Sequence, residues 1–296
     1  MISATIVTNM QSPTWHISTL ILRRNYTANL VMKRFLTLMT IVAAVASCAP
    51  KKQVLVLYYS QTGTTQAVAE EIQRRLGADI ERIDVVDAYD GSYEQTIARC
   101  QKEMSEGTLP PLRPLGVSLD GYDTIFLGYP IWFGTCALPV LSLLDSVDLS
   151  GKIIVPFCTF GSGGLGASSE DVREAEPNAD VREGYGVRTA RLGAAQKEIE
   201  RFLVLNGYLD GDVEIYEDYS AQEPVTPEEA EIFSQACSGY KYPLGKPMSV
   251  GSRKTSEGTD YKFTAVSSGE GGRASELTIF VTVPDGGVAE FTQVVR

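Results

Sequence analysis

The sequence predicts an α/β protein with a doubly wound parallel sheet, followed by a smaller α+β domain. Three observations support this prediction. Between residues 53 and 209, short apolar runs alternate with helical patterns. Glycine and hydroxyl residues follow several of these runs, and beyond residue 210 the apolar residues alternate with polar ones. Strands buried on both faces read as continuous apolar runs, and their alternation with helices is typical of parallel sheets.

The elements of the first domain follow one another in a regular order. The run QVLVLYY at 53–59 has the length of a buried strand, and Val68, Ile72 and Leu76 form one face of a helix over 65–76. The same reasoning predicts further strands at 80–86, 124–129, 152–158 and 185–189, and further helices at 93–105, 138–144, 170–176 and 194–205.

The last part of the chain, 210–296, has a different pattern. A helix over 224–237 is indicated by Thr226 as N-cap, Pro227 in the first helical position and acidic residues in the first turn. Four strands are predicted at 248–254, 261–266, 277–283 and 288–295, with a hairpin signal at Asp285-Gly286. No catalytic constellation is visible there, so we expect a docking or dimerisation module.

The N-terminal 47 residues are expected to be an extension and an export signal. A basic start at Lys33 and Arg34 precedes an apolar run of signal-peptide length, which ends in small residues before Cys48. This ending resembles the bacterial lipoprotein box and implies a lipid on Cys48, with 48–52 as a tether. The sequence therefore predicts a protein anchored to a bacterial membrane, with its domains outside the cytoplasm.

Charge and composition exclude several functions. The net charge is −11, and residues 48–296 hold 22 basic against 37 acidic residues, a net charge of −15. A nucleic acid is therefore not expected as a partner. The only histidine is His16 in the extension, so histidine-dependent catalysis and zinc sites are not expected in the working protein. The five cysteines form no C-x-x-C pair, and we predict no metal site and no catalytic residue.

The loop after the first strand predicts a phosphate site. It consists of Ser60, Gln61, Thr62, Gly63, Thr64 and Thr65. The loop leads into a helix, where free backbone N–H groups and the helix dipole favour an anion even without lysine or arginine. A helix cap rich in Ser and Thr explains the same residues, so this alternative stays open.

Two further loops lie at the ends of later strands, the edge where such sheets bind ligands. The loop after the third strand contains Pro130, Ile131, Trp132, Phe133, Gly134 and Thr135. Its two bulky aromatic residues favour a flat ligand, although Trp132 could also be a core anchor. The loop after the fourth strand contains Thr159, Phe160, Gly161, Ser162, Gly163, Gly164, Leu165 and Gly166. It matches the dinucleotide pattern G-x-G-x-x-G, but in the wrong turn of the sheet, so a loop lying against the edge of a ligand is preferred.

Together the three loops resemble those of the flavodoxin family. Ser60, Thr62, Gly63 and Thr65 match its phosphate loop S/T-x-T-G-x-T, and the stretches 128–135 and 156–164 resemble its second and third flavin loops. The resemblance covers about 53–209 and implies a five-stranded doubly wound sheet with non-covalent FMN. It also implies that the first loop holds the phosphate and that the other two line the isoalloxazine ring. One position departs from the family, because Phe160 or glycine stands where flavodoxins often stack a tyrosine.

The resemblance implies an FMN-binding redox protein, either an electron carrier or a flavin-dependent oxidoreductase. The carrier is favoured because no second nucleotide motif is visible apart from the loop at Gly161. Its partner would be a redox protein or a small electron donor or acceptor, neither of which the sequence identifies. The alternative is a non-redox binding lipoprotein that keeps the fold, has lost the cofactor and acts through its acidic C-terminal domain.

Overall fold

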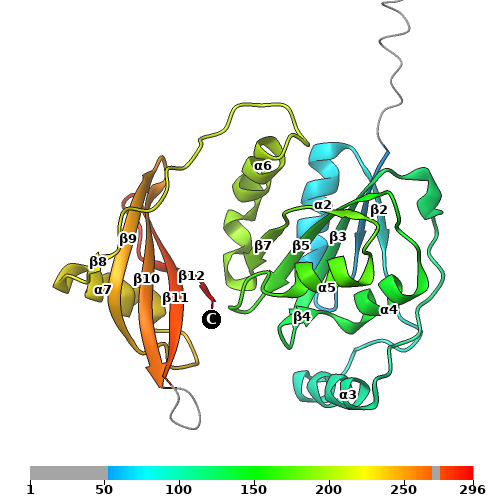
Figure 1. The fold of residues 1–296 in the computed structure, drawn as a ribbon, viewed down its shortest axis with the longest axis horizontal. Helices are drawn as coiled ribbons and strands as arrows, with labels where there is room; N and C mark the ends of the chain where they lie inside the picture. Colours follow the sequence, from blue (N-terminus) through cyan, green and yellow to red (C-terminus); the bar gives the residue numbers. More distant parts are fainter. Residues whose placement is uncertain (1–52, 269–273, 296) are drawn as a thin grey trace, which may run out of the picture. The chain divides into compact units, whose positions relative to one another are not determined.

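A computed structural model describes residues 53–268 and 274–295, with a parallel sheet in the first part and an antiparallel sheet in the last (Figure 1). The predicted signal segment, the tether and the lipid attachment at Cys48 lie outside these residues. Within the described ranges, no helix combines the length and the apolar character that crossing a bilayer requires.

The parallel sheet has the doubly wound order that the sequence predicts. In spatial order its strands are β2 (Asp79–Arg82), β1 (Val54–Tyr58), β3 (Thr124–Trp132), β5 (Ile153–Phe160) and, sharing the last place, β6 (Asp180–Val181) and β7 (Tyr185–Arg188). Its helices are α2 (Thr64–Leu76), α3 (Tyr93–Glu106), α4 (Leu138–Ser146), α5 (Ser168–Ala175) and α6 (Ala195–Leu205). The α/β prediction is therefore confirmed.

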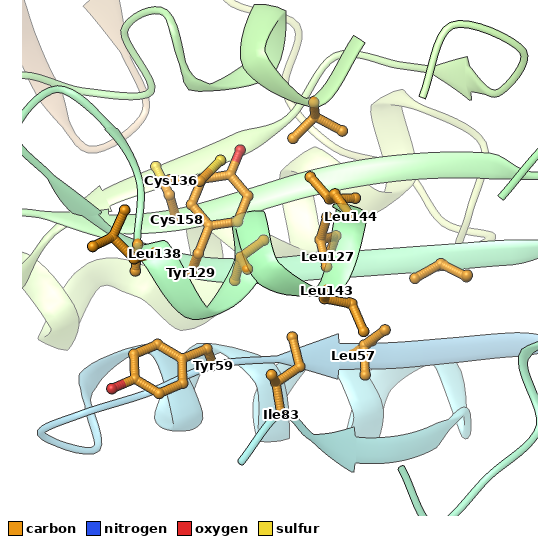
Figure 2. Packing of buried hydrophobic residues seen from close by; sticks show 14 of the residues in the cluster. Leu57, Tyr59, Ile83, Leu127, Tyr129, Cys136, Leu138, Leu143, Leu144 and Cys158 are labelled. Carbon is orange, nitrogen blue, oxygen red and sulfur yellow. The ribbon is translucent and has the colours of Figure 1, made fainter. Parts of the chain in front are cut away.

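The continuous apolar run of β1 fills two hydrophobic clusters, one on each face of the sheet. Leu55 and Leu57 belong to the cluster that includes residues of α4, part of which Figure 2 shows. Val56 points to the other cluster, where it meets Val68 and Ile72 of α2. Each of these side chains is fully or almost fully buried, and such burial contributes roughly 1.5–3 kcal/mol per side chain.

The chain changes faces between β1 and β3, and this change locates the site. The helix after β1 packs in one cluster and the helix after β3 in the other. Neighbouring crossovers that leave in opposite directions open a crevice outside the carboxyl ends of the two strands. The loops after β1, β3 and β5 all meet at this edge of the sheet.

Among the elements that differ from the sequence prediction, two lie near the site. The strand expected over 80–86 ends at Arg82, because Val85 pairs instead with Leu112 in an antiparallel bridge. The third strand extends to Trp132 and turns back into β4 (Thr135–Cys136), a hairpin that the sequence did not reveal.

The C-terminal part forms a separate antiparallel sheet, as predicted. Its elements are β8 (Glu223–Pro224), α7 (Pro227–Cys237), β9 (Lys246–Thr255), β10 (Gly258–Ser268), β11 (Ala274–Pro284) and β12 (Glu290–Val295). Thr226 caps α7 in a capping box with Glu229, and the ring of Phe233 packs edge-on against Phe263 at 5.2 Å. The capping box stabilises the start of the predicted helix, and the ring contact packs that helix on the predicted meander.

Candidate functional site

The loop after β1 delivers a helix N-terminus without a side-chain cap. Gly63 occupies the N-cap position of α2 with φ 88°, and no side-chain cap hydrogen bond is formed. The N–H of Gly63 itself donates to Ser60 Oγ at 3.1 Å. The first N–H groups of any helix lack intrahelical partners, and here the left-handed glycine supplies no side chain to satisfy them. The backbone of this turn is therefore suited to an external anion.

The hydroxyl groups of the loop divide into a buried and an accessible set. Thr65 is fully buried, and its hydroxyl lies 2.8 Å from that of Thr159 at the end of β5. Thr64 is half-buried and lies 3.4 Å from the same hydroxyl, whereas Thr62 is exposed. The structure thus joins the predicted phosphate loop to the predicted third flavin loop, and it leaves Thr62 and Thr64 accessible to a ligand.

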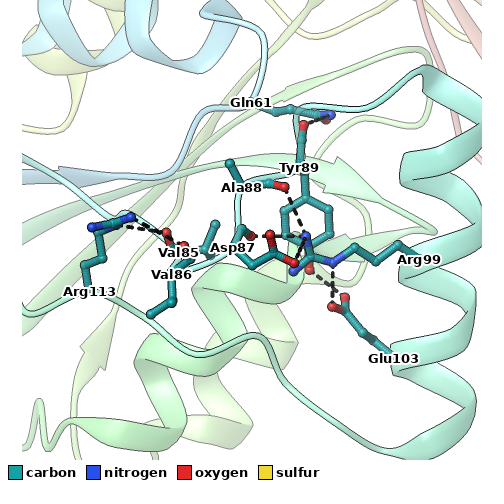
Figure 3. Close-up of polar contacts among 9 residues, drawn as sticks. All are labelled: Gln61, Val85, Val86, Asp87, Ala88, Tyr89, Arg99, Glu103 and Arg113. Atoms are coloured by element: carbon teal, nitrogen blue, oxygen red, sulfur yellow. Dashed lines mark hydrogen bonds and ion pairs between the residues drawn. The ribbon is translucent and has the colours of Figure 1, made fainter.

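Gln61 has a different local role from its neighbours. Its side-chain amide donates to the carbonyl of Tyr89 at 2.9 Å (Figure 3). The same amide group also donates to Thr96 Oγ1 at 3.0 Å. A carboxamide has two N–H donors, and both are engaged here. Only the backbone N–H of Gln61 remains for the predicted phosphate.

Tyr89 is part of the site's surroundings that the sequence did not reveal. Its ring is 5% exposed, its hydroxyl donates to Glu103 at 2.5 Å, and the Arg99 guanidinium lies 3.8 Å above the ring centre (Figure 3). Burial and the neighbouring Glu103 raise the pKa of Tyr89 well above its usual value, so the phenol stays protonated. Its ring meets Trp132 edge-on at 5.1 Å.

The second predicted loop is a tight hairpin. Trp132 of β3 pairs with Thr135 of β4, and only Phe133 and Gly134 connect them. Both have positive φ, 52° and 87°, as a two-residue type I′ turn requires. Thr135 donates its hydroxyl proton to the carboxylate of Asp171 on α5. The hairpin is therefore tied to α5, while Phe133 is 52% exposed at its tip.

The side chains of Pro130, Ile131 and Trp132 are half-buried. Trp132 also meets Tyr59 edge-on, with ring centres 5.7 Å apart. Ile131 and Trp132 pack against the hydrophobic cluster of one sheet face. This half-buried position is compatible with both interpretations of Trp132, as a residue that covers a flat ligand and as a core anchor.

The third predicted loop presents backbone rather than side chains. Thr159 and Phe160 are buried at the end of β5, so the Phe160 ring belongs to the core. Gly161 and Gly163 each have open space within 4 Å of the position that a Cβ would occupy. Ser162 between them is half-buried. A flat group could therefore approach the main chain at the two glycines.

Arg82 is a further residue that sequence analysis missed. It ends β2, directly opposite Tyr58 in β1, and its Nη2 donates to the carbonyl of Ser60 at 2.9 Å. Its Nε forms an ion pair with Asp84 at 3.0 Å. The carboxyl ends of neighbouring parallel strands adjoin each other, and this rule could have indicated a cation at the phosphate loop.

The described residues contain no cluster of His, Cys, Asp and Glu that could hold a metal ion. Their cysteines are free, and burial raises the pKa of the Cys136 thiol to about 12. The site therefore combines anion-binding backbone, hydroxyl groups and aromatic rings, without an activated nucleophile in the part of the chain that the structure covers.

Comparisons with known proteins identify the family of the first domain. The family model described as Flavodoxin matches residues 53–200, which is half of the chain. Flavodoxin 1 from Salmonella typhimurium is 29% identical over 106 residues, and this match covers 34% of the present chain and 46% of that protein.

Solved structures include similar proteins. One is a protein from Bacteroides uniformis assigned as a flavoprotein, with 26% identity, a TM-score of 0.46, and coverage of 50% of this chain and 98% of that one. Another is a flavoprotein in complex with FMN from Lactobacillus acidophilus, with 23% identity, a TM-score of 0.42, and coverage of 50% and 99%. Because the family model matches half of the chain, the chain belongs to the flavodoxin family.

Proposed function

We propose that this protein binds FMN and carries electrons at the surface of a bacterial membrane. The main support is the uncapped N-terminus of α2 behind Gly63, whose free N–H groups suit the phosphate of FMN. The accessible hydroxyls of Thr62 and Thr64 add donors at the same place. The open backbone at Gly161 and Gly163 suits the edge of a flat ring.

The bound flavin would supply the redox chemistry, and the protein would bind and orient it. The first loop would hold the phosphate, and the hairpin at Phe133 and the glycine loop would flank the ring. An electron carrier needs a ring edge that reaches the surface, and the half-exposed Phe133 at the hairpin tip suits such an edge. A flavin-dependent oxidoreductase remains the alternative within this class.

Attachment to the membrane is a proposal from the sequence alone. Cys48 at the end of the signal-like run would carry the lipid, and the domains would face away from the cytoplasm. Mass spectrometry of the mature N-terminus from the native host would test it. A lipid-modified Cys48 is expected, and an unmodified Cys48 peptide would contradict the anchor.

The colour of the purified protein tests FMN binding. A yellow protein that releases FMN on denaturation is expected. A colourless protein that does not take up added FMN would favour the non-redox binding lipoprotein. Anaerobic addition of NADH or NADPH then separates carrier from enzyme, because direct bleaching of the flavin would favour an oxidoreductase.

Thr62→Ala tests the location of the phosphate. A lost hydrogen bond to a charged group is worth about 1.5–3 kcal/mol, or roughly one to two decades in Kd. We expect weaker FMN binding and unchanged binding of riboflavin, which lacks the phosphate. Thr108→Ala, at another exposed threonine, is the matched control. An equal loss for both ligands would place the phosphate elsewhere.

A further inference from the structure

A cation lies beside the phosphate loop, although neither the loop nor the first turn of its helix supplies one. The guanidinium of Arg82 reaches from the edge strand β2 to the carbonyl of Ser60, at 2.9 Å. Ser60 begins the loop, and its own hydroxyl accepts the N–H of Gly63 at 3.1 Å. Arg82 therefore contacts the same short segment whose far end forms the uncapped helix terminus.

The guanidinium has capacity to spare. Arginine carries five N–H donors, of which one faces Ser60 and one faces Asp84. The side chain is 43% exposed, so the other donors can meet a ligand or solvent. A guanidinium also matches phosphate oxygens in its geometry, which a lysine ammonium does not.

Carboxylates lie beside Arg82 and on the neighbouring elements. Asp84 is paired with it at 3.0 Å, and Glu81 lies next to it on β2, where its carboxylate accepts the N–H of Gly116 at 2.6 Å. Glu70 lies on the exposed side of α2. Of these carboxylates, that of Asp84 is the one in contact with Arg82, and its negative charge would act against a phosphate dianion bound at the loop if Arg82 did not neutralise it.

We propose that Arg82 determines the preference of this site for a phosphorylated flavin. Its charge would attract the phosphate dianion, and its hydrogen bond to Ser60 would hold the start of the loop. Asp84 would moderate the effect by neutralising part of the charge. This inference rests on the proposed FMN site and adds a residue from outside the three loops.

The test compares Arg82→Gln, Arg82→Lys and Asp84→Asn with the parent protein. Apoprotein is titrated with FMN, riboflavin and inorganic phosphate at low and at high salt. Arg82→Gln should weaken FMN and phosphate binding, on the order of tenfold at low salt, and leave riboflavin binding unchanged. Arg82→Lys should retain part of the preference, and Asp84→Asn should increase FMN affinity.

Salt provides a second measurement. Screening weakens interactions between exposed charges, so the parent should lose more FMN affinity at high salt than Arg82→Gln does. Equal weakening of FMN and riboflavin binding by Arg82→Gln would show that Arg82 only shapes the loop, and this would overturn the proposal. No change in either affinity would overturn it as well. A parent that binds neither flavin would instead contradict the FMN site itself.

Discussion

The hydroxyl oxygens of Thr65 and Thr159 lie 2.8 Å apart, although 94 residues separate them in the sequence. Both side chains are almost completely buried. The hydrogen bond joins the turn that begins α2 to the end of β5, so it fixes two of the three ligand loops against each other. It also means that each hydroxyl is satisfied within the protein.

This pair predicts a non-additive effect on stability. Thr159→Val alone leaves the Thr65 hydroxyl buried without its partner, at a cost of about 1–3 kcal/mol. Thr65→Val alone leaves the Thr159 hydroxyl only the longer 3.4 Å contact with Thr64 and should cost less. The double variant removes both groups and should cost less than the sum of the single variants. Urea unfolding of the apoprotein measures all three values. Additive losses would show that the two hydroxyls do not depend on each other.

Gly161→Ala should separate ligand binding from folding. A Cβ at Gly161 meets open space within 4 Å and its φ is not positive, so the Tm of the apoprotein should change little. If the flavin ring lies against this backbone, the added methyl group occupies ring space and weakens FMN binding. Gly193→Ala, which has the same open surroundings, is the control and should leave FMN binding intact. Equal FMN affinities of the two variants would show that the ring does not lie against Gly161.

Trp132 should report the bound ring. In a mature chain that begins at Cys48 it is the only tryptophan, and its edge-on contacts with Tyr59 and Tyr89 hold it near the hairpin. We expect quenched fluorescence in the FMN-bound protein, recovery in the apoprotein, and FMN binding weaker by about 0.5–1.5 kcal/mol in Trp132→Ala, the range of an aromatic pair. Fluorescence that ignores flavin removal would assign Trp132 to the core alone.

Glu176 should make stability depend on pH. It is 5% exposed, its Oε2 accepts the N–H of Leu149 at 3.1 Å, and its Oε1 has no hydrogen-bond partner within the described ranges. Burial, with a smaller contribution from Asp148, raises the pKa of this carboxyl. The folded state therefore keeps its proton to higher pH than the unfolded state does. The stabilising contribution is complete below the unfolded pKa and is lost as the pH rises through the folded pKa.

Glu176→Gln keeps an acceptor for Leu149 and removes the charge. At pH 7 we expect its free energy of unfolding to exceed that of the parent by roughly 0.5–2 kcal/mol, so that it unfolds at a higher temperature. In acid this difference should disappear. Glu174→Gln, at an exposed position of α5 two residues before Glu176, should behave like the parent at both pH values. A pH-independent difference for Glu176→Gln would contradict the buried charge.

The sequence was most informative where burial leaves a regular pattern. The apolar runs predicted the strands and the parallel, doubly wound class of the sheet, because β1, β3 and β5 are covered on both faces. It failed where a residue reaches the site from another element. Arg82 and Tyr89 have no local signal, since their partners are the Ser60 carbonyl and Gln61, 22 and 28 residues away. The hairpin at Phe133 was missed because a bulky residue with positive φ contradicts ordinary turn preferences.

Gly128 and Phe157 face each other as partners in β3 and β5, and a Cβ on Gly128 would lie 2.1 Å from the Phe157 ring. The size of the side chain at either of these two positions therefore limits the size at the other. A larger residue at position 128 requires a smaller one at 157, so substitutions at the two positions should occur together during evolution. Aligned relatives should therefore show covariation of this pair, and a Gly128→Ala variant should regain stability when Phe157→Leu accompanies it.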